Sequence, residues 1–281
     1  MSATRKGLSI IGAGHLGMTL GRLWHEHQVF EIADVVTRSA HSATQAAQFI
    51  GAGRPLADLN DIADADVFLI ATADDQLAPV CDELARAGRF HAGQVVFHCS
   101  GALTSAVLGT AAAAGATVAS VHPIRSFAQP SDVIGTFAGT WCGTEGEPQA
   151  QAVINPAFES IGGRLVSIRP EHKTLYHAAA VFASNYLVTL VDAALLAYEG
   201  AGVPRAQALQ MVRPLTENTL QNILRVGPDA ALSGPIARGD MQTVARQDQA
   251  LTALRPELGE LYRMLARHTA EMVRRSRRED P

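Results

Sequence analysis

Residues Leu8 to Gly21 read LSIIGAGHLGMTLG, a short apolar run followed by a glycine-patterned turn and then by a helix pattern. Gly12 permits the tight turn after the strand, Gly14 lacks the Cβ that would keep a diphosphate from the backbone, and Gly17 lets the helix pack close to the sheet. Free N–H groups at the helix start favour phosphate. The stretch predicts a dinucleotide site, with contacts from the whole turn: Gly12, Ala13, Gly14, His15, Leu16 and Gly17.

The composition is that of an ordinary globular protein. The chain has 281 residues, of which 47% are hydrophobic and 18% charged, and its net charge is -4. This charge gives no basic field to attract nucleic acid, so the partner we expect is a small molecule. The three cysteines, Cys81, Cys99 and Cys142, do not have the spacing of metal ligands. The same is true of the histidines and carboxylates, so we expect no metal site. Unpaired cysteines, and no room for a signal peptide before the first strand, indicate a cytoplasmic protein.

Strand and helix patterns alternate over the first 169 residues. Strands separated by helix-length segments predict an α/β fold, a doubly wound parallel (Rossmann) sheet with helices on both faces. Strands are expected at 32–37, 67–72, 95–98 and 117–121, with weaker ones at 139–142 and 164–168. Helices are expected between them at 44–50, 76–87, 103–114 and 148–160.

Only helix patterns follow residue 170, at 171–199, 205–226, 241–255 and 257–275. We therefore expect a Rossmann domain at 1–169 and a smaller all-α domain at 170–281. Segment 178–198 is apolar enough to suggest a membrane span, but the polar residues Asn185 and Asp192 lie within it. A helix that is apolar on nearly all sides in a soluble protein is buried, so we expect the central helix of a homodimeric helical domain and no membrane contact.

The end of the second strand decides between NAD and NADP, because it faces the adenosine ribose. Here the strand ends in Thr37, Arg38 and Ser39, where an NAD site would place a carboxylate, and Asp34 lies too early to replace it. Arg38 can bind a 2′-phosphate bidentately while the two hydroxyls donate hydrogen bonds. The sequence thus favours NADP, with Thr72 after the third strand as a further contact; the alternative is that Arg38 is an ordinary surface residue.

Three further motifs, VHPIRSF (121–127), YHAAAVFASNY (176–186) and GPIARGD (234–240), carry a family resemblance. The arrangement resembles the 6-phosphogluconate dehydrogenase-like superfamily, which includes β-hydroxyacid dehydrogenases, ketopantoate reductase, pyrroline-5-carboxylate reductase and deazaflavin-dependent NADP oxidoreductases. More narrowly, the motifs resemble a family that pairs a Rossmann-like NADP domain with a helical domain of unknown function. The resemblance covers essentially the whole chain and implies an NADP oxidoreductase.

In the β-hydroxyacid dehydrogenases a lysine early in the first helix of the second domain acts as acid or base, with an asparagine four residues later. Lys173 stands at the place of that lysine, and His177 stands where the asparagine would be. The spacing puts both side chains on one helix face. Desolvation and like charge would lower the pKa of a lysine beside a histidine, which suits proton transfer near neutral pH. The alternatives are a solvated lysine and a hydrogen-bonded core histidine.

Four other residues are candidates for the same site. The resemblance places Ser100, before Gly101, beside the nicotinamide and substrate, and His122 ends the next strand at the same edge of the sheet. Arg238 lies in a glycine-bounded loop and could bind a substrate carboxylate, or could form a structural ion pair. Asn185 either contacts substrate or ties its helix to a neighbour. Asp74, Asp75 and Asp240 are expected to cap helices.

The sequence hypothesis is an NADP-dependent reductase of a small carbonyl acid, a ketopantoate-like 2-keto acid first of all. The hydride would leave beside Ser100, and Lys173 or His177 would protonate the product. Two alternatives stay open at this point. One is reduction of an imine in the manner of pyrroline-5-carboxylate reductase, and the other is an NADP-binding sensor without turnover.

Overall fold

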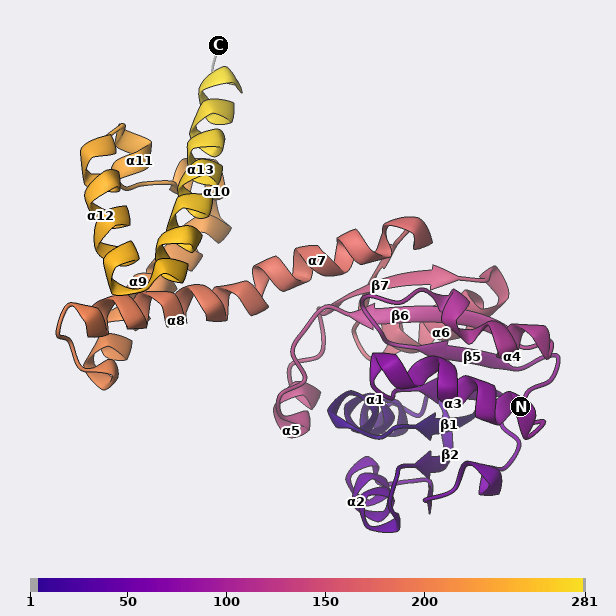
Figure 1. Cartoon of the computed structure of the whole chain (residues 1–281). Helices are drawn as coiled ribbons and strands as arrows, with labels where there is room; N and C mark the ends of the chain where they lie inside the picture. Colours follow the sequence, from indigo (N-terminus) through magenta and orange to yellow (C-terminus); the bar gives the residue numbers. More distant parts are fainter. Residues whose placement is uncertain (1–4, 280–281) are drawn as a thin grey trace. The chain divides into compact units, whose positions relative to one another are not determined.

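Eight strands form one sheet in the part of the chain that the computed structural model describes, residues 5–279 (Figure 1). The strand order is β3-β2-β1-β4-β5-β6-β7-β8. The strands are β1 (Gly7–Ile11), β2 (Glu31–Val36), β3 (Arg54–Leu56), β4 (Val67–Ile70), β5 (Val95–His98), β6 (Thr117–Pro123), β7 (Trp141–Gly146) and β8 (Arg164–Ser167).

The sheet reverses direction once. Strands β1 to β6 are parallel in the doubly wound order, which confirms the predicted α/β Rossmann fold. Strand β7 is antiparallel to β6 and pairs Gly143 with His122, whereas β8 is again parallel to β7. Parallel pairing needs a crossover, usually a full helix, but the connection from β6 to β7 contains only the short α5 (Pro130–Ile134). The chain therefore returns beside β6 in the opposite direction.

Helices cover both faces of the sheet because neighbouring strand residues point to opposite sides. Leu69 and Phe97 belong to a core that includes side chains from α1 (His15–Glu26), α2 (Ala40–Ile50) and α6 (Pro148–Ser160). The adjacent pair, Phe68 and Val96, points to the opposite face of the sheet. It belongs to a second core that includes side chains from α3 (Asp74–Arg86) and α4 (Gly109–Ala113). The expected helix at 103–114 is shorter than predicted, since a 3-10 turn at Ser105–Leu108 precedes α4.

The second unit is helical. Its elements are α8 (Asn185–Gly200), α9 (Arg205–Val226), α10 (Pro228–Ala231), α11 (Pro235–Arg238), α12 (Met241–Leu254) and α13 (Pro256–Glu279). The long helices agree with the sequence patterns, and the one-turn helices α10 and α11 are additions. Asp240 is the N-cap of α12 and accepts a hydrogen bond from the Thr243 amide, as predicted.

The boundary between the two compact units falls between Val181 and Phe182, later than the expected residue 170. Helix α7 (Lys173–Ala183) belongs mainly to the first unit because its first residue is anchored in the sheet. Lys173 is 1% exposed, and its ammonium contacts the Ser120 hydroxyl of β6 and lies 2.8 Å from a Glu145 carboxylate oxygen of β7. Burial lowers the pKa of Lys173, and the Glu145 carboxylate opposes that shift.

The apolar segment 178–198 is largely left uncovered by the chain itself, whereas the burial that we expected included contact with a second subunit. Length and composition would let the run Pro170–Gly200 cross a membrane, yet only 6% of its apolar window is buried within the chain. Ser184 leaves helical geometry (φ -123°, ψ -68°) and separates α7 from α8. Within the second unit, α8 buries Leu195 against Ala208 and Val212 of α9 and packs Gly200 against Leu254 of α12, while Tyr186, Val188 and Leu190 stay exposed.

The Lys173–Glu145 pair yields a stability prediction. Lys173→Met leaves the Glu145 carboxylate buried without its cation and should lower the free energy of unfolding by about 3–5 kcal/mol. Lys173→Met combined with Glu145→Gln removes both charges and should recover part of that loss. Urea unfolding followed by circular dichroism measures both effects. The exposed Arg169→Met, whose partner Glu171 lies 3.9 Å away, is the control and should cost less than about 1 kcal/mol. A Lys173→Met protein as stable as the wild type would contradict this account.

Candidate active site

The glycine turn after β1 has the geometry that its sequence predicts. Gly12 has φ +86°, and an added Cβ there would lie 2.7 Å from the Thr72 amide nitrogen at the end of β4. Gly17 packs against the Gly12 carbonyl, where an added Cβ would lie 2.8 Å from that oxygen. An added Cβ at Gly14 would meet nothing within 4 Å, so the backbone there is open to an approaching ligand.

Polar groups around this turn are free to meet a ligand. The Thr72 hydroxyl oxygen is buried and has no hydrogen-bond partner among residues 5–279. Helix α1 begins at His15, and no acidic residue occupies its first turn. His15 Nδ1 lies 2.8 Å from the Phe127 carbonyl, which ties the end of the VHPIRSF motif to the glycine turn. Ala13 and Leu16 pack into or against the apolar core beneath. The turn can therefore accept a diphosphate at the helix start.

The predicted phosphate-binding residues after β2 are partly engaged with one another. Ser39 is the N-cap of α2, and its hydroxyl accepts a hydrogen bond from the Ser42 amide. The Thr37 hydroxyl donates to the Ser39 carbonyl at 2.9 Å. Arg38 between them is exposed, and its guanidinium forms no ion pair within the described range 5–279. Asp34 is buried and binds Arg54 and the Ala63 amide, so it is a structural residue.

Strands β5 and β6 bring a second polar group to the same edge, because the carboxyl ends of parallel strands lie together. Ser100 follows β5, and its hydroxyl donates to a carboxylate oxygen of Asp74 at 2.9 Å. The same hydroxyl accepts hydrogen bonds from the amides of Ala102 and Leu103. Asp74 and Asp75 do not cap α3 as we expected, since the N-cap residue is Ala73 and both lie in the first turn.

Two histidines meet over Gly101, which follows Ser100. An added Cβ at Gly101 would lie 2.8 Å from His122 Nε2 and would also collide with His177 Nδ1. The two imidazole ring centroids are 5.7 Å apart. His177 Nδ1 is buried and has no hydrogen-bond partner in the described part of the chain. Only glycine at position 101 leaves room for both rings, so this residue lies at the candidate site together with Ser100, with which the sequence analysis paired it.

Tyr176 completes the cluster. Its phenol oxygen lies 3.1 Å from His122 Nδ1, and the two rings meet edge to face. Burial raises the pKa of Tyr176 to about 12, so the phenol is neutral. Burial, and then the nearby His177 and Lys173, lower the pKa of His122 to about 4, so the imidazole is neutral at neutral pH. The neutral phenol of Tyr176 thus faces the neutral imidazole of His122.

His98, at the end of β5, is a buried structural histidine. Its Nδ1 accepts a hydrogen bond from the Ser100 amide at 3.1 Å, while Nε2 lies 3.1 Å from the Thr104 carbonyl. Burial, with help from the charge on Lys173, lowers the pKa of His98 to about 4. Glu145 accepts two hydrogen bonds from Ser105 in addition to its contact with Lys173. These residues form the buried support below the Ser100–Gly101 turn.

The predicted catalytic residues are thus only partly brought together. His122, His177 and Ser100 lie around Gly101. Lys173 lies on the same helix as His177, but both its charge and its hydrogen bonds are directed to Glu145 and Ser120. Asn185 and Arg238 are exposed residues of the second unit, and their roles stay predictions. Tyr176 stands beside His177 in the YHAAAVF motif, and Glu145 is an acid inside an otherwise uncharged strand; these were the available signals that sequence reasoning missed.

Both halves of the chain match known protein families. Residues 1–123 match the family described as Rossmann-like domain, and residues 140–269 match the family Domain of unknown function (DUF2520). No curated protein matches the chain.

Solved structures with a similar fold cover nearly the whole chain. A Thermotoga maritima protein is 23% identical with a TM-score of 0.75, over 96% of this chain and 99% of that one. A candidate NADP oxidoreductase of Bacteroides fragilis is 21% identical with a TM-score of 0.76, over 95% and 98%. A reductive aminase from Aspergillus terreus, in complex with NADPH and ethyl-5-oxohexanoate, is 18% identical with a TM-score of 0.67, over 99% and 95%. The chain therefore consists of a Rossmann-like domain followed by a DUF2520 domain, and it shares the fold of these proteins.

Proposed function

We propose that the protein is an NADP-dependent oxidoreductase that reduces the C=O or C=N group of a small carboxylic acid. One observation carries this proposal. The glycine turn after β1 and the His122–His177 pair lie at the carboxyl-terminal edge of the same parallel sheet. In such folds this edge holds both the coenzyme and the reacting group.

The residues of the glycine turn fit a dinucleotide. Gly14 is open to approach, the start of α1 offers free amides, and the unpartnered Thr72 hydroxyl can hydrogen-bond a ligand. Arg38 is an exposed cation beside the N-cap of α2, which suits a 2′-phosphate. When bound, the coenzyme supplies the hydride. The similar structures from Bacteroides fragilis and Aspergillus terreus, described as a candidate NADP oxidoreductase and as an NADPH complex, support the choice of NADP.

His122 and His177 are the residues that the geometry favours for hydrogen-bonding the reacting C=O or C=N group. Both rings carry nitrogens toward the Ser100–Gly101 turn, and His122 is neutral with one N–H to donate. Lys173 is less suited, because transfer of its proton would leave Glu145 as a buried, unpaired anion. We therefore assign Lys173 a supporting role in place of the acid–base role that its sequence position suggested.

Among substrate classes, imines are as well supported as 2-keto acids. Similar structures include a reductive aminase, imine reductases of Myxococcus stipitatus and a pyrroline-5-carboxylate reductase of Coxiella burnetii. No such support exists for a ketopantoate-like acid in particular. Arg238, an exposed residue at the end of the short helix α11, remains our candidate for binding a substrate carboxylate.

Turnover is tested by following NADPH oxidation with a panel of 2-keto acids and cyclic imines. We expect oxidation with at least one class, and His122→Asn should lower kcat/KM about 100-fold or more, because the loss of one well-placed hydrogen-bond donor to the developing charge costs on that scale. The exposed His91→Gln is the control and should leave kcat/KM unchanged. NADPH binding without oxidation across the panel would favour a sensor over an enzyme, and absence of NADPH binding would overturn the whole proposal.

The coenzyme preference has its own test. Arg38→Asp should weaken NADP binding about tenfold or more, because it replaces a charge-assisted contact with repulsion, while NAD binding should change little. Isothermal titration calorimetry measures both. Arg86→Asp, at the exposed end of α3, is matched for charge and should affect neither coenzyme. Equal losses for NAD and NADP in Arg38→Asp would remove the argument for the 2′-phosphate.

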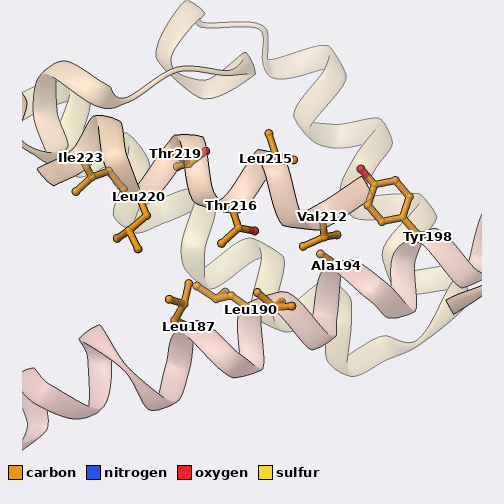
Figure 2. A pocket seen from close by; sticks show the side chains of 11 residues that line it. Leu187, Leu190, Ala194, Tyr198, Val212, Leu215, Thr216, Thr219, Leu220 and Ile223 are labelled. Atoms are coloured by element: carbon orange, nitrogen blue, oxygen red, sulfur yellow. The ribbon is translucent and has the colours of Figure 1, made fainter. Parts of the chain in front are cut away.

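We further propose that the helical unit pairs with a second copy of the chain. Apolar side chains are exposed along α8 and α9, including Val188 at 71% and Leu224 at 78%. An open apolar groove also runs between the two helices, lined by Leu187, Leu190, Leu215 and Leu220 among others (Figure 2). Exposed apolar surface of this kind marks a protein or membrane contact.

Two features favour a protein partner over a membrane. Lys173, near the start of the long apolar run, is fixed in the sheet of a globular unit. Asp192 lies within the run and is ion-paired with Arg205 at 2.5 Å, a charged pair that would be costly inside a bilayer.

The oligomeric state tests this pairing. Sedimentation equilibrium should give about twice the chain mass of 29.7 kDa for the wild type. Val188→Glu together with Leu224→Glu should shift the mass toward one chain, because the two carboxylates would be buried without partners in the interface. Gln221→Glu, an exposed polar position of α9, is the control. A monomeric wild type, or a double variant that stays dimeric while folded by circular dichroism, would contradict the proposal.

A further inference from the structure

The Tyr176 phenol lies across the pair of residues that joins β6 to β7. His122 and Gly143 face each other in register, and Tyr176 packs on both. An added Cβ at Gly143 would lie 2.5 Å from the phenol oxygen and 2.7 Å from the ring carbon that bears it. Gly143 therefore lets the ring approach the sheet closely enough to reach His122.

The hydrogen bonds around the phenol oxygen indicate which way its proton points. Two acceptors lie within reach of the phenol proton, namely His122 Nδ1 at 3.1 Å and the His122 carbonyl at 3.5 Å. The shorter contact is the better hydrogen bond. A neutral imidazole that accepts at Nδ1 carries its own proton on Nε2.

We propose that Tyr176 is a positioning residue that holds His122 in the tautomer protonated at Nε2, so that this N–H is the donor presented to the substrate at the Ser100–Gly101 turn. His177 Nδ1 is the second half of this site. It is buried, has no partner among residues 5–279, and approaches the same face of Gly101. A buried nitrogen without a partner is destabilising, and a ligand that hydrogen-bonds it would remove that cost.

The charged and titratable groups near His122 are consistent with a neutral ring. Lys173 and His177 of α7 oppose protonation of His122, and Asp74 at the start of α3 weakly favours it. Burial is the largest of these effects, and it also keeps the Tyr176 phenol protonated. The pair thus stays a neutral donor and a neutral acceptor at neutral pH.

This inference names a positioning residue for the proposed reductase, but its first test does not need activity. The full chain is labelled with 15N-histidine, and two-bond 1H–15N correlation spectra report which ring nitrogen of each histidine carries the proton. His122→Asn identifies the His122 signals by their loss. We expect Nε2 of His122 to be protonated in the wild type and the tautomers to become mixed or reversed in Tyr176→Phe. Tyr262→Phe, which removes a phenol that binds Gln247 in the second unit, should change nothing at His122.

Two spectral results would overturn the proposal. One is a wild-type His122 protonated at Nδ1, which would mean that the phenol accepts from the ring. The other is an unchanged His122 tautomer in a folded Tyr176→Phe protein. Where a substrate is turned over, Tyr176→Phe should also lower kcat about tenfold or more with little change in KM. Failure to oxidise NADPH would remove the proposed reductase and leave the tautomer result standing by itself.

Discussion

The buried ion pair between Lys173 and Glu145 is the interaction on which the arrangement of the site depends. Two opposite charges held away from water are stable only while each remains the partner of the other. The pair therefore fixes the first residue of α7 against β6 and β7. Tyr176 and His177 follow on the same helix and reach His122 and Gly101 as a consequence. A helix whose sequence resembles the start of a second domain is in this way made part of the first.

Two glycines let the side chains of α7 approach the sheet closely enough to form the candidate site. Gly101 admits the rings of both histidines, and Gly143 admits the phenol of Tyr176. Larger residues at either place would push α7 away from the sheet. The polar support beneath is fully bonded: Ser100 binds Asp74, and Glu145 binds Ser105 as well as Lys173. Of the nitrogens around Gly101, His177 Nδ1 is left without a partner within residues 5–279, as expected where a ligand binds.

The helices of the second unit expose many apolar side chains. A chain that folds alone covers most of its large apolar side chains, but α8 and α9 keep many exposed. Segment 178–198 is apolar on nearly all sides, a pattern that predicts burial in the helical domain and against a second copy. The chain itself covers α8 only in part, and the proposed second copy would cover the exposed remainder.

The sequence by itself determined the Rossmann fold, the glycine turn and the long helices, because these depend on local spacing: apolar runs of strand length, glycines at fixed intervals and the 3.6-residue period. It also placed His122 and Ser100 at one edge, since the carboxyl ends of parallel strands lie together, whereas the position of His177 beside them came from the structure. Only the tertiary structure decided the antiparallel return of β7, the burial of Lys173 and the contact of Tyr176 with His122. Each of these joins residues that are about twenty or more positions apart in the chain. Such contacts depend on which partner compensates a buried charge or fills a space, and local sequence does not specify that partner.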